Sequence, residues 1–265
     1  MSTATTLTTA TLAAPSRVSF PTAAAVFVGR SMRHSARDVE TLLMSIGLPA
    51  ILMAVFTYVF GGALDPSGRY VDYIVPGIIL VCAGFGAAQT AVAVSRDLAE
   101  GMVDRLRTMA VPRGLAIFGH VVASTARNLV ATAVVVGVGL AMGFRPTAGV
   151  VEWALAIGLL TLYIVAITYA YAAIGVVAGS PEAAQGYGFI LLFLPYVSSA
   201  FVAVDTMPGW LQSFARHQPI TPLIDSLRGW LVGGPGDAVV AFAWVAGLVV
   251  LGATASSLLF ARRAR

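Results

Sequence analysis

The side chains best suited to chemistry are densest in one stretch, "RDLAEGMVDRLRTMAVPR" at 96–113. It holds seven of the chain's 28 charged residues, and a long apolar run lies on each side. Asp97, Glu100 and Asp104 are residue types that could bind a metal–diphosphate group, the chemistry of a membrane-embedded transferase of lipid metabolism. The sequence has no second acidic loop to complete such a site, so the transferase is kept only as an alternative.

Several other chemistries lack their residues. Lysine is absent from the sequence, although a Walker A loop needs one for the phosphates and a Schiff-base enzyme needs one as nucleophile. Any ATP that drives this protein must therefore be hydrolysed by another polypeptide. Cys82 is the single cysteine, the three histidines lie far apart, and His217 and Asp225 have no accompanying nucleophile. We expect no catalytic residue, no metal site and no cofactor held by this chain.

A docking role explains the charged stretch better. Leu98, Met102, Leu106 and Met109 recur at spacings of four, four and three, which is one apolar stripe on a helix. Pro112 then stops the helix. Arginines alone would suffice to set membrane topology, because acids contribute little to it. The mixed charge and the stripe together predict a helix at about 96–111 that docks on a soluble partner.

The composition predicts an all-α integral membrane protein. Hydrophobic residues make up 58% of the chain and charged residues 11%, with a mean hydropathy of +0.87. Soluble domains carry about 25% charged residues, and a membrane helix needs about 20 apolar ones. We predict six spans, at about 42–60, 73–94, 116–143, 150–177, 185–204 and 238–260.

Two further segments flank or interrupt these spans. Residues 1–22 are predicted to be a disordered cytoplasmic tail, and residues 23–40 an amphipathic interfacial helix with its arginines on one face; a plain solvated helix is the alternative. The segment 205–236 is too broken by prolines to span and too apolar for a free loop. We predict two short helices there that re-enter the outer leaflet, and its candidate residues are Pro208, Trp210, His217, Pro219 and Arg228.

Orientation follows from the arginines. With the N-terminus inside, the inner segments hold eleven arginines and the outer segments four. Both termini and the stretch 96–113 are therefore expected in the cytoplasm. Arg127 falls within a span, where it either reaches the cytoplasmic headgroups or pairs with a polar group.

From about residue 25 to 260 the chain resembles the membrane subunits of ABC type-2 exporters, particularly the daunorubicin-resistance-like permeases. The resemblance is carried by "YIVPGIILVCAGFG" (73–86), "DRLRTMAVPR" (104–113) and "GFRP" (143–146), and most specifically by "SSAFVAVDTMPGWLQSFARHQPITPLIDSLRG" (198–229). It implies that 41–265 is a six-span permease domain in the cell membrane of a prokaryote. It also implies outward transport of a drug, lipid or glycan-like substrate.

The resemblance further implies the partners. Two copies of a separate ATP-binding-cassette ATPase, which bind the ATP and Mg²⁺, would grip the cytoplasmic coupling helix at about 96–111 and the interfacial helix. A second permease, identical or similar, would complete the exporter in the lipid bilayer, and no nucleic acid is involved. The coupling residues would be Arg96, Asp97, Glu100, Asp104, Arg105, Arg107, Arg30, Arg33 and Arg37.

Five polar residues within the spans could face a substrate path between two permeases: Gln89, Tyr163, Tyr169, Gln185 and Tyr187. The alternative is that they simply hold helices together. Gly84 and Gly86 are expected to be close-packing positions. An ion-coupled secondary transporter is a further alternative, but it needs acids inside the membrane, and the acids here fall at span edges or in loops.

Overall fold

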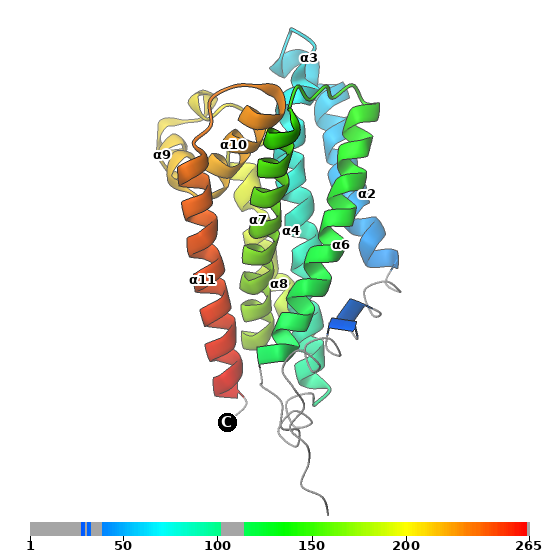
Figure 1. The fold of residues 1–265 in the computed structure, drawn as a ribbon, viewed down its shortest axis with the longest axis vertical. Helices are drawn as coiled ribbons and strands as arrows, with labels where there is room; N and C mark the ends of the chain where they lie inside the picture. Colours follow the sequence, from blue (N-terminus) through cyan, green and yellow to red (C-terminus); the bar gives the residue numbers. More distant parts are fainter. Residues whose placement is uncertain (1–27, 30, 33–38, 102–113, 264–265) are drawn as a thin grey trace, which may run out of the picture.

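The chain folds as a bundle of helices (Figure 1). The structure, a computed structural model, describes residues 28–29, 31–32, 39–101 and 114–263, and within these ranges the regular elements are all helical. The α-helices of the bundle are α2 (Val39–Val55), α3 (Gly61–Leu64), α4 (Tyr70–Ala99), α6 (Gly114–Ala141), α7 (Val150–Val177), α8 (Pro181–Leu192), α9 (Gly209–His217), α10 (Ile220–Val232) and α11 (Ala238–Arg263). A π-helical turn, η1 (Phe56–Phe60), joins α2 to α3, and two 3-10 turns, η2 (Leu194–Val197) and η3 (Val204–Thr206), lie between α8 and α9.

Five helical stretches of the described chain are long and apolar enough to cross a membrane. They are Leu42–Leu64, Tyr70–Ala99, Ile117–Ala141, Val150–Val177 and Ala238–Arg263. These correspond to the first four predicted spans and the last, so the prediction of an all-α integral membrane protein is confirmed at this level.

The predicted span at 185–204 takes a different form. Helix α8 begins with Ser180, whose hydroxyl accepts the Ala183 N–H at 3.2 Å, and has only 12 residues. At 1.5 Å per residue it rises about 18 Å, which is less than the hydrocarbon core of a bilayer. Pro195 lacks a backbone N–H and lies in the 3-10 turn η2, where the regular helix gives way. The structure therefore does not confirm a sixth span.

The stretch 96–111 also differs from one continuous helix. Residues 96–99 are the last turn of α4. The chain then turns at Glu100 and at Gly101, whose φ of +77° suits glycine because it has no Cβ. The rest of the predicted coupling helix, 102–113, lies outside the described residues.

Helix α4 forms the centre of the bundle. Within its span window 72% is buried, against 17% for the span that contains α2 and 11% for α11. Three close approaches to α4 depend on glycine or on small residues. A Cβ on Gly77 would lie 2.7 Å from Ala200, one on Gly86 would lie 1.8 Å from the Asn128 Oδ1, and one on Gly175 would lie 2.4 Å from the Ala91 carbonyl oxygen. Gly86 is thus a close-packing position as expected, whereas a Cβ on Gly84 would meet only ordinary contact at 3.4 Å.

The two helices α9 and α10 lie together at one end of the bundle, and the C-terminal end of α11 lies at the other (Figure 1). Two short helices therefore do lie within 205–236, and their re-entry into the outer leaflet of a membrane stays a prediction. Helix α10 buries its apolar face, including Leu223, Ile224 and Leu227, in the main core. The backbone N–H of Thr147 donates to the Leu231 carbonyl at 2.8 Å and holds the end of α10 beside the loop before α7.

Candidate functional site

A contact between a histidine and an aspartate joins the end of α4 to the start of α6. His120 Nε2 lies 2.9 Å from Asp97 Oδ2, and both side chains are mostly buried. The chain leaves α4 just after Asp97 and returns into α6 just before His120, so the pair ties together the two ends of the segment that contains 102–113. The sequence alone assigns no role to His120 and does not predict this contact.

The other predicted coupling residues are less well defined by the structure. Arg96 and Glu100 are exposed at the end of α4, where coupling residues would have to be. Near them, at the start of α8, a hydrogen bond from the Ser180 side chain lowers the pKa of the Glu182 carboxyl, and the charge of Arg96 adds to the effect. The remaining candidates lie outside the described residues: Asp104, Arg105, Arg107, Arg30, Arg33 and Arg37.

Beyond the His120–Asp97 contact, a polar seam runs between α6 and α4. On α6 its residues follow His120 at intervals of four: Ser124, Asn128 and Thr132. Thr90 Oγ1 donates to Ser124 Oγ at 3.0 Å, and Asn128 Nδ2 donates to the Ala83 carbonyl at 3.2 Å. Side-chain hydrogen bonds of this kind hold membrane helices together. The i, i+4 repeat of polar residues in an apolar helix was the signal that could have predicted the seam.

Arg127 lies beside this seam. Its Nη2 donates to the Gly86 carbonyl oxygen at 3.2 Å. Of the two sequence-based alternatives for this arginine, the contact supports pairing with a neighbouring polar group.

At the opposite end of the bundle, Arg228 connects α10 to α4 and to the loop before η3. Its guanidinium donates to Asp225 Oδ1 at 2.8 Å, to the Ser199 carbonyl at 2.6 Å and to the Tyr73 carbonyl at 3.2 Å. It also lies 3.9 Å from the centre of the Tyr73 ring, a cation–π contact. The sequence had singled out Arg228, but not the partners that hold it.

The other candidates of this segment do not join the Arg228 network. Trp210 is 76% exposed on α9, as a side chain that meets lipid headgroups would be. His217 Nδ1 lies 2.7 Å from the Ser213 carbonyl oxygen of the same helix. Pro208 and Pro219 immediately precede α9 and α10. Their positions suit helix starts, where the missing proline N–H costs no hydrogen bond.

Helix α8 presents an exposed aromatic face. The rings of Phe189 and Phe193 are 5.1 Å apart, and those of Phe193 and Tyr196 are 6.1 Å apart. Gln185 is exposed one turn before Phe189, and α8 packs against α4, which carries the half-buried Gln89. The exposed side of α8 thus carries apolar rings beside the Gln185 amide.

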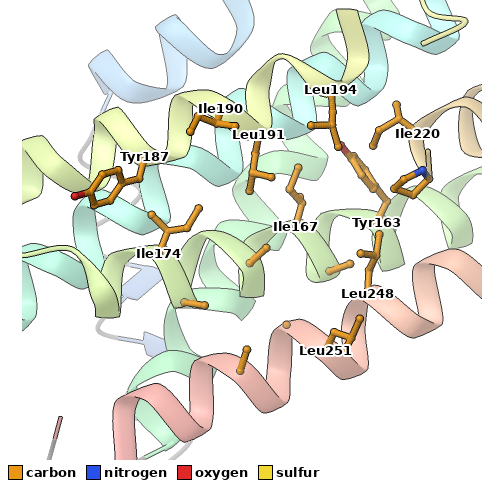
Figure 2. Close-up of a pocket in the computed structure, with 16 residues that line it drawn as sticks. Tyr163, Ile167, Ile174, Tyr187, Ile190, Leu191, Leu194, Ile220, Leu248 and Leu251 are labelled. Atoms are coloured by element: carbon orange, nitrogen blue, oxygen red, sulfur yellow. The ribbon is translucent and has the colours of Figure 1, made fainter. Parts of the chain in front are cut away.

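A groove of about 520 Å³ lies on the other side of α8, between α7, α8 and α11 (Figure 2). Tyr163 and Tyr187 are the two polar side chains among its sixteen lining residues, and the rest are apolar or glycine. Tyr169, Gln89 and Gln185 do not line it. The five candidate path residues are therefore divided between the groove, the aromatic face and the packed interior, rather than brought together at one site.

No group of three or more metal-ligating side chains occurs among the described residues. The described surfaces can instead bind partners and ligands through hydrogen bonds and apolar contacts.

Comparison with known proteins finds a matching family model and several similar proteins. A family model described as "ABC-2 type transporter" matches residues 22–232. The daunorubicin resistance ABC transporter permease protein DrrB1 of Streptomyces coeruleorubidus is 29% identical over 238 residues, which cover 89% of this chain and 82% of that protein. The probable doxorubicin resistance ABC transporter permease protein DrrC of Mycobacterium tuberculosis is 28% identical over 228 residues, covering 84% of this chain and 82% of that protein.

Proposed function

This chain belongs to the ABC-2 type transporter family, and from that premise we propose how it works as the membrane permease subunit of an ABC exporter. Two copies of a separate ATPase bind ATP and Mg²⁺ and supply the energy. A second permease, identical or similar, completes the pathway in the plasma membrane of a prokaryote. The family match over most of the chain carries the proposal, and the five spanning helices agree with it.

In the membrane, the end of the bundle with Asp97, His120 and the α11 C-terminus faces the cytoplasm. The arginine excess of the segments at this end supports that orientation. The α9–α10 end then faces outward, and α8 with the chain up to η3 completes a sixth crossing.

Single cysteines test the orientation in intact cells, with Cys82 replaced by alanine. Ser67→Cys, in the loop before α4, should react with a membrane-impermeant maleimide from outside, and Arg262→Cys only after permeabilisation. The reverse labelling pattern would refute the orientation.

Energy coupling takes place at the end of α4 and the segment after it. The Asp97–His120 pair fixes both ends of that segment to the bundle, so a pull exerted there by the ATPase moves α4 and α6 together. Because α4 is the most buried span, its displacement repacks the centre of the permease.

Charge reversal tests the coupling surface. Glu100→Arg combined with Asp104→Arg should abolish co-purification of the ATPase and substrate efflux, because docking through these acids becomes repulsive. Asp237→Arg, an exposed acid at the opposite end of the bundle, is the control: it removes a hydrogen bond that caps α11 but should leave co-purification of the ATPase unchanged. Unchanged co-purification in the double variant would contradict docking through these residues.

The substrate is an amphipathic molecule, and its path follows the aromatic face of α8 at the junction with the second permease. Gln185 on α8 and Gln89 on α4 contact it there, and Tyr169 borders the path from α7, whereas Tyr163 and Tyr187 line the groove on the other side of α8. The support is the exposure of the Phe189 and Phe193 rings, each more than half exposed. The relatives' names point to anthracycline-like drugs as the first substrates to try.

Phe193→Ala should lower drug efflux without loss of ATPase binding, since this ring lies directly after α8 and is 53% exposed. Phe118→Ala, on an exposed face of α6, is the matched control. Equal efflux in both variants would argue against a path along α8.

A further inference from the structure

The groove between α7, α8 and α11 has the dimensions of one lipid chain. Its lining on α7 runs along one helix face from Tyr163 to Ile174, a rise of about 16 Å. Half of a typical hydrocarbon core is about 15 Å thick. The start of α10 contributes Ile220 to the lining at the Tyr163 end, whereas Ile174 lies one turn from the end of α7 (Figure 2). The groove therefore runs along the helices for the depth of a single leaflet.

The lining excludes charged ligand parts. It contains no charged residue, and its total exposed surface is almost wholly apolar. A charged or strongly polar group placed there would lose its hydration without a compensating partner. An aliphatic lipid chain has no such cost, and close packing against the groove stabilises it there. The side chains on α11, including Leu248, Leu251 and Ala255, offer such packing at helical spacing.

The same stripe of α11 continues to a cationic end. Leu248, Leu251 and Ala255 share one helix face, and the position seven residues beyond Ala255, two turns further along that face, is Arg262. Arg262 is exposed, and it lies about 10 Å past the groove. The neighbouring Arg263 instead turns to α7, where its guanidinium donates to the Val176 and Ala178 carbonyls.

We propose that this groove binds one acyl chain of an anionic phospholipid whose phosphate contacts Arg262. The depth of one leaflet, the uncharged lining and the complementary charge beyond its open end all fit this ligand. Tyr187, exposed on α8, borders the groove on the side away from α11 and can hydrogen-bond the lipid's glycerol region. The proposal goes beyond the transport function; it uses the orientation proposed above only to assign the lipid to the cytoplasmic leaflet.

Lipid binding is measured on the full chain purified in a maltoside detergent, by native mass spectrometry during titration with dioleoyl phosphatidylglycerol or dioleoyl phosphatidylcholine. The two lipids carry the same chains and differ in headgroup charge. One phosphatidylglycerol should be retained about fivefold more tightly than phosphatidylcholine, the factor expected for one basic residue at a membrane surface.

Two variants distinguish the contribution of the acyl chain to lipid binding from that of the headgroup. Ala255→Phe fills the groove and should weaken binding of both lipids at least tenfold, while Ala246→Phe, exposed on another face of α11, should not. Arg262→Gln should reduce phosphatidylglycerol affinity about fivefold, to that of phosphatidylcholine, and Arg216→Gln at the opposite end should leave it unchanged. Ala173→Phe serves as a second groove-filling variant if Ala255→Phe does not fold.

The proposal would be overturned if Ala255→Phe and Ala173→Phe both retained lipid as well as Ala246→Phe does. A mass spectrum in which those variants lose a second copy of the chain rather than a lipid would also overturn it, as would stoichiometric displacement of the lipid by daunorubicin. The assay needs neither ATPase nor efflux. Failure of lipid binding therefore leaves the transport function untouched, and failure of transport leaves lipid binding to be measured.

Discussion

Replacing Arg228 by alanine should destabilise the outer end of the bundle strongly. The arginine makes three hydrogen bonds, two to carbonyl oxygens and one to Asp225, and it stacks on Tyr73. Its side chain is 15% exposed, so these interactions are only weakly screened by water. Breaking a buried ion pair costs about 3–5 kcal/mol. Because Asp225 is 37% exposed and can be partly solvated, we expect a loss of about 2–4 kcal/mol in the free energy of unfolding.

The single cysteine provides the assay. Cys82 is fully buried, so a thiol-reactive fluorogenic dye in detergent reports unfolding as the protein is heated. By the scaling known for soluble proteins of this size, the midpoint for Arg228→Ala should fall by about 5–15 °C. Arg228→Lys keeps the charge but not the planar guanidinium, so its unfolding midpoint should lie between those of wild type and Arg228→Ala.

The matched control is Arg216→Ala. Arg216 also pairs with an aspartate, Asp205, but the two side chains are 56% and 82% exposed, and such surface pairs contribute little. Its midpoint should stay within about 2 °C of wild type. Equal midpoints for Arg228→Ala and Arg216→Ala would refute the reasoning that the Arg228 network holds α10 to α4.

Three further predictions follow from the packing. Gly86→Ala should lower the free energy of unfolding by about 1–3 kcal/mol in the same thermal assay, because the added Cβ would clash with the Asn128 amide on α6. Gly84→Ala is the control and should lower it by less than about 1 kcal/mol. Equal losses for the two variants would contradict the packing of α4 on α6. Tyr163→Phe removes a buried hydroxyl with no hydrogen-bond partner in the described chain, so the free energy of unfolding should stay unchanged or rise by about 1 kcal/mol. Tyr171→Phe loses a hydrogen bond to a carbonyl on α8 and should lower the free energy of unfolding by about 1 kcal/mol. An equally large loss for Tyr163→Phe would contradict this reasoning. Asp97→Asn should retain the ATPase on purification but slow efflux several-fold, since the carboxylate that meets His120 is lost. Full efflux in membrane vesicles would count against the coupling role of the pair.

The spans were predictable because hydropathy is a local property. The prediction of 150–177 coincides with α7, and the last predicted span, 238–260, differs from α11 by only a few residues. The fifth predicted span was not recovered as a helix of spanning length, because hydropathy does not show that η2 interrupts the helix at Pro195. The same local reasoning extended a helix across Gly101, where the chain turns.

The sequence by itself determined that the chain is apolar enough for a membrane, which segments are apolar enough to cross it, and that it has no lysine for a Walker A loop. Only the tertiary structure decided that His120 meets Asp97, that Arg228 meets the carbonyl of Tyr73, and that three helices enclose an apolar groove. The physical reason is that these helices are apolar around most of their circumference. Their sequence pattern therefore does not show which face meets protein and which meets lipid, and that choice is made by side-chain packing between segments distant in the chain.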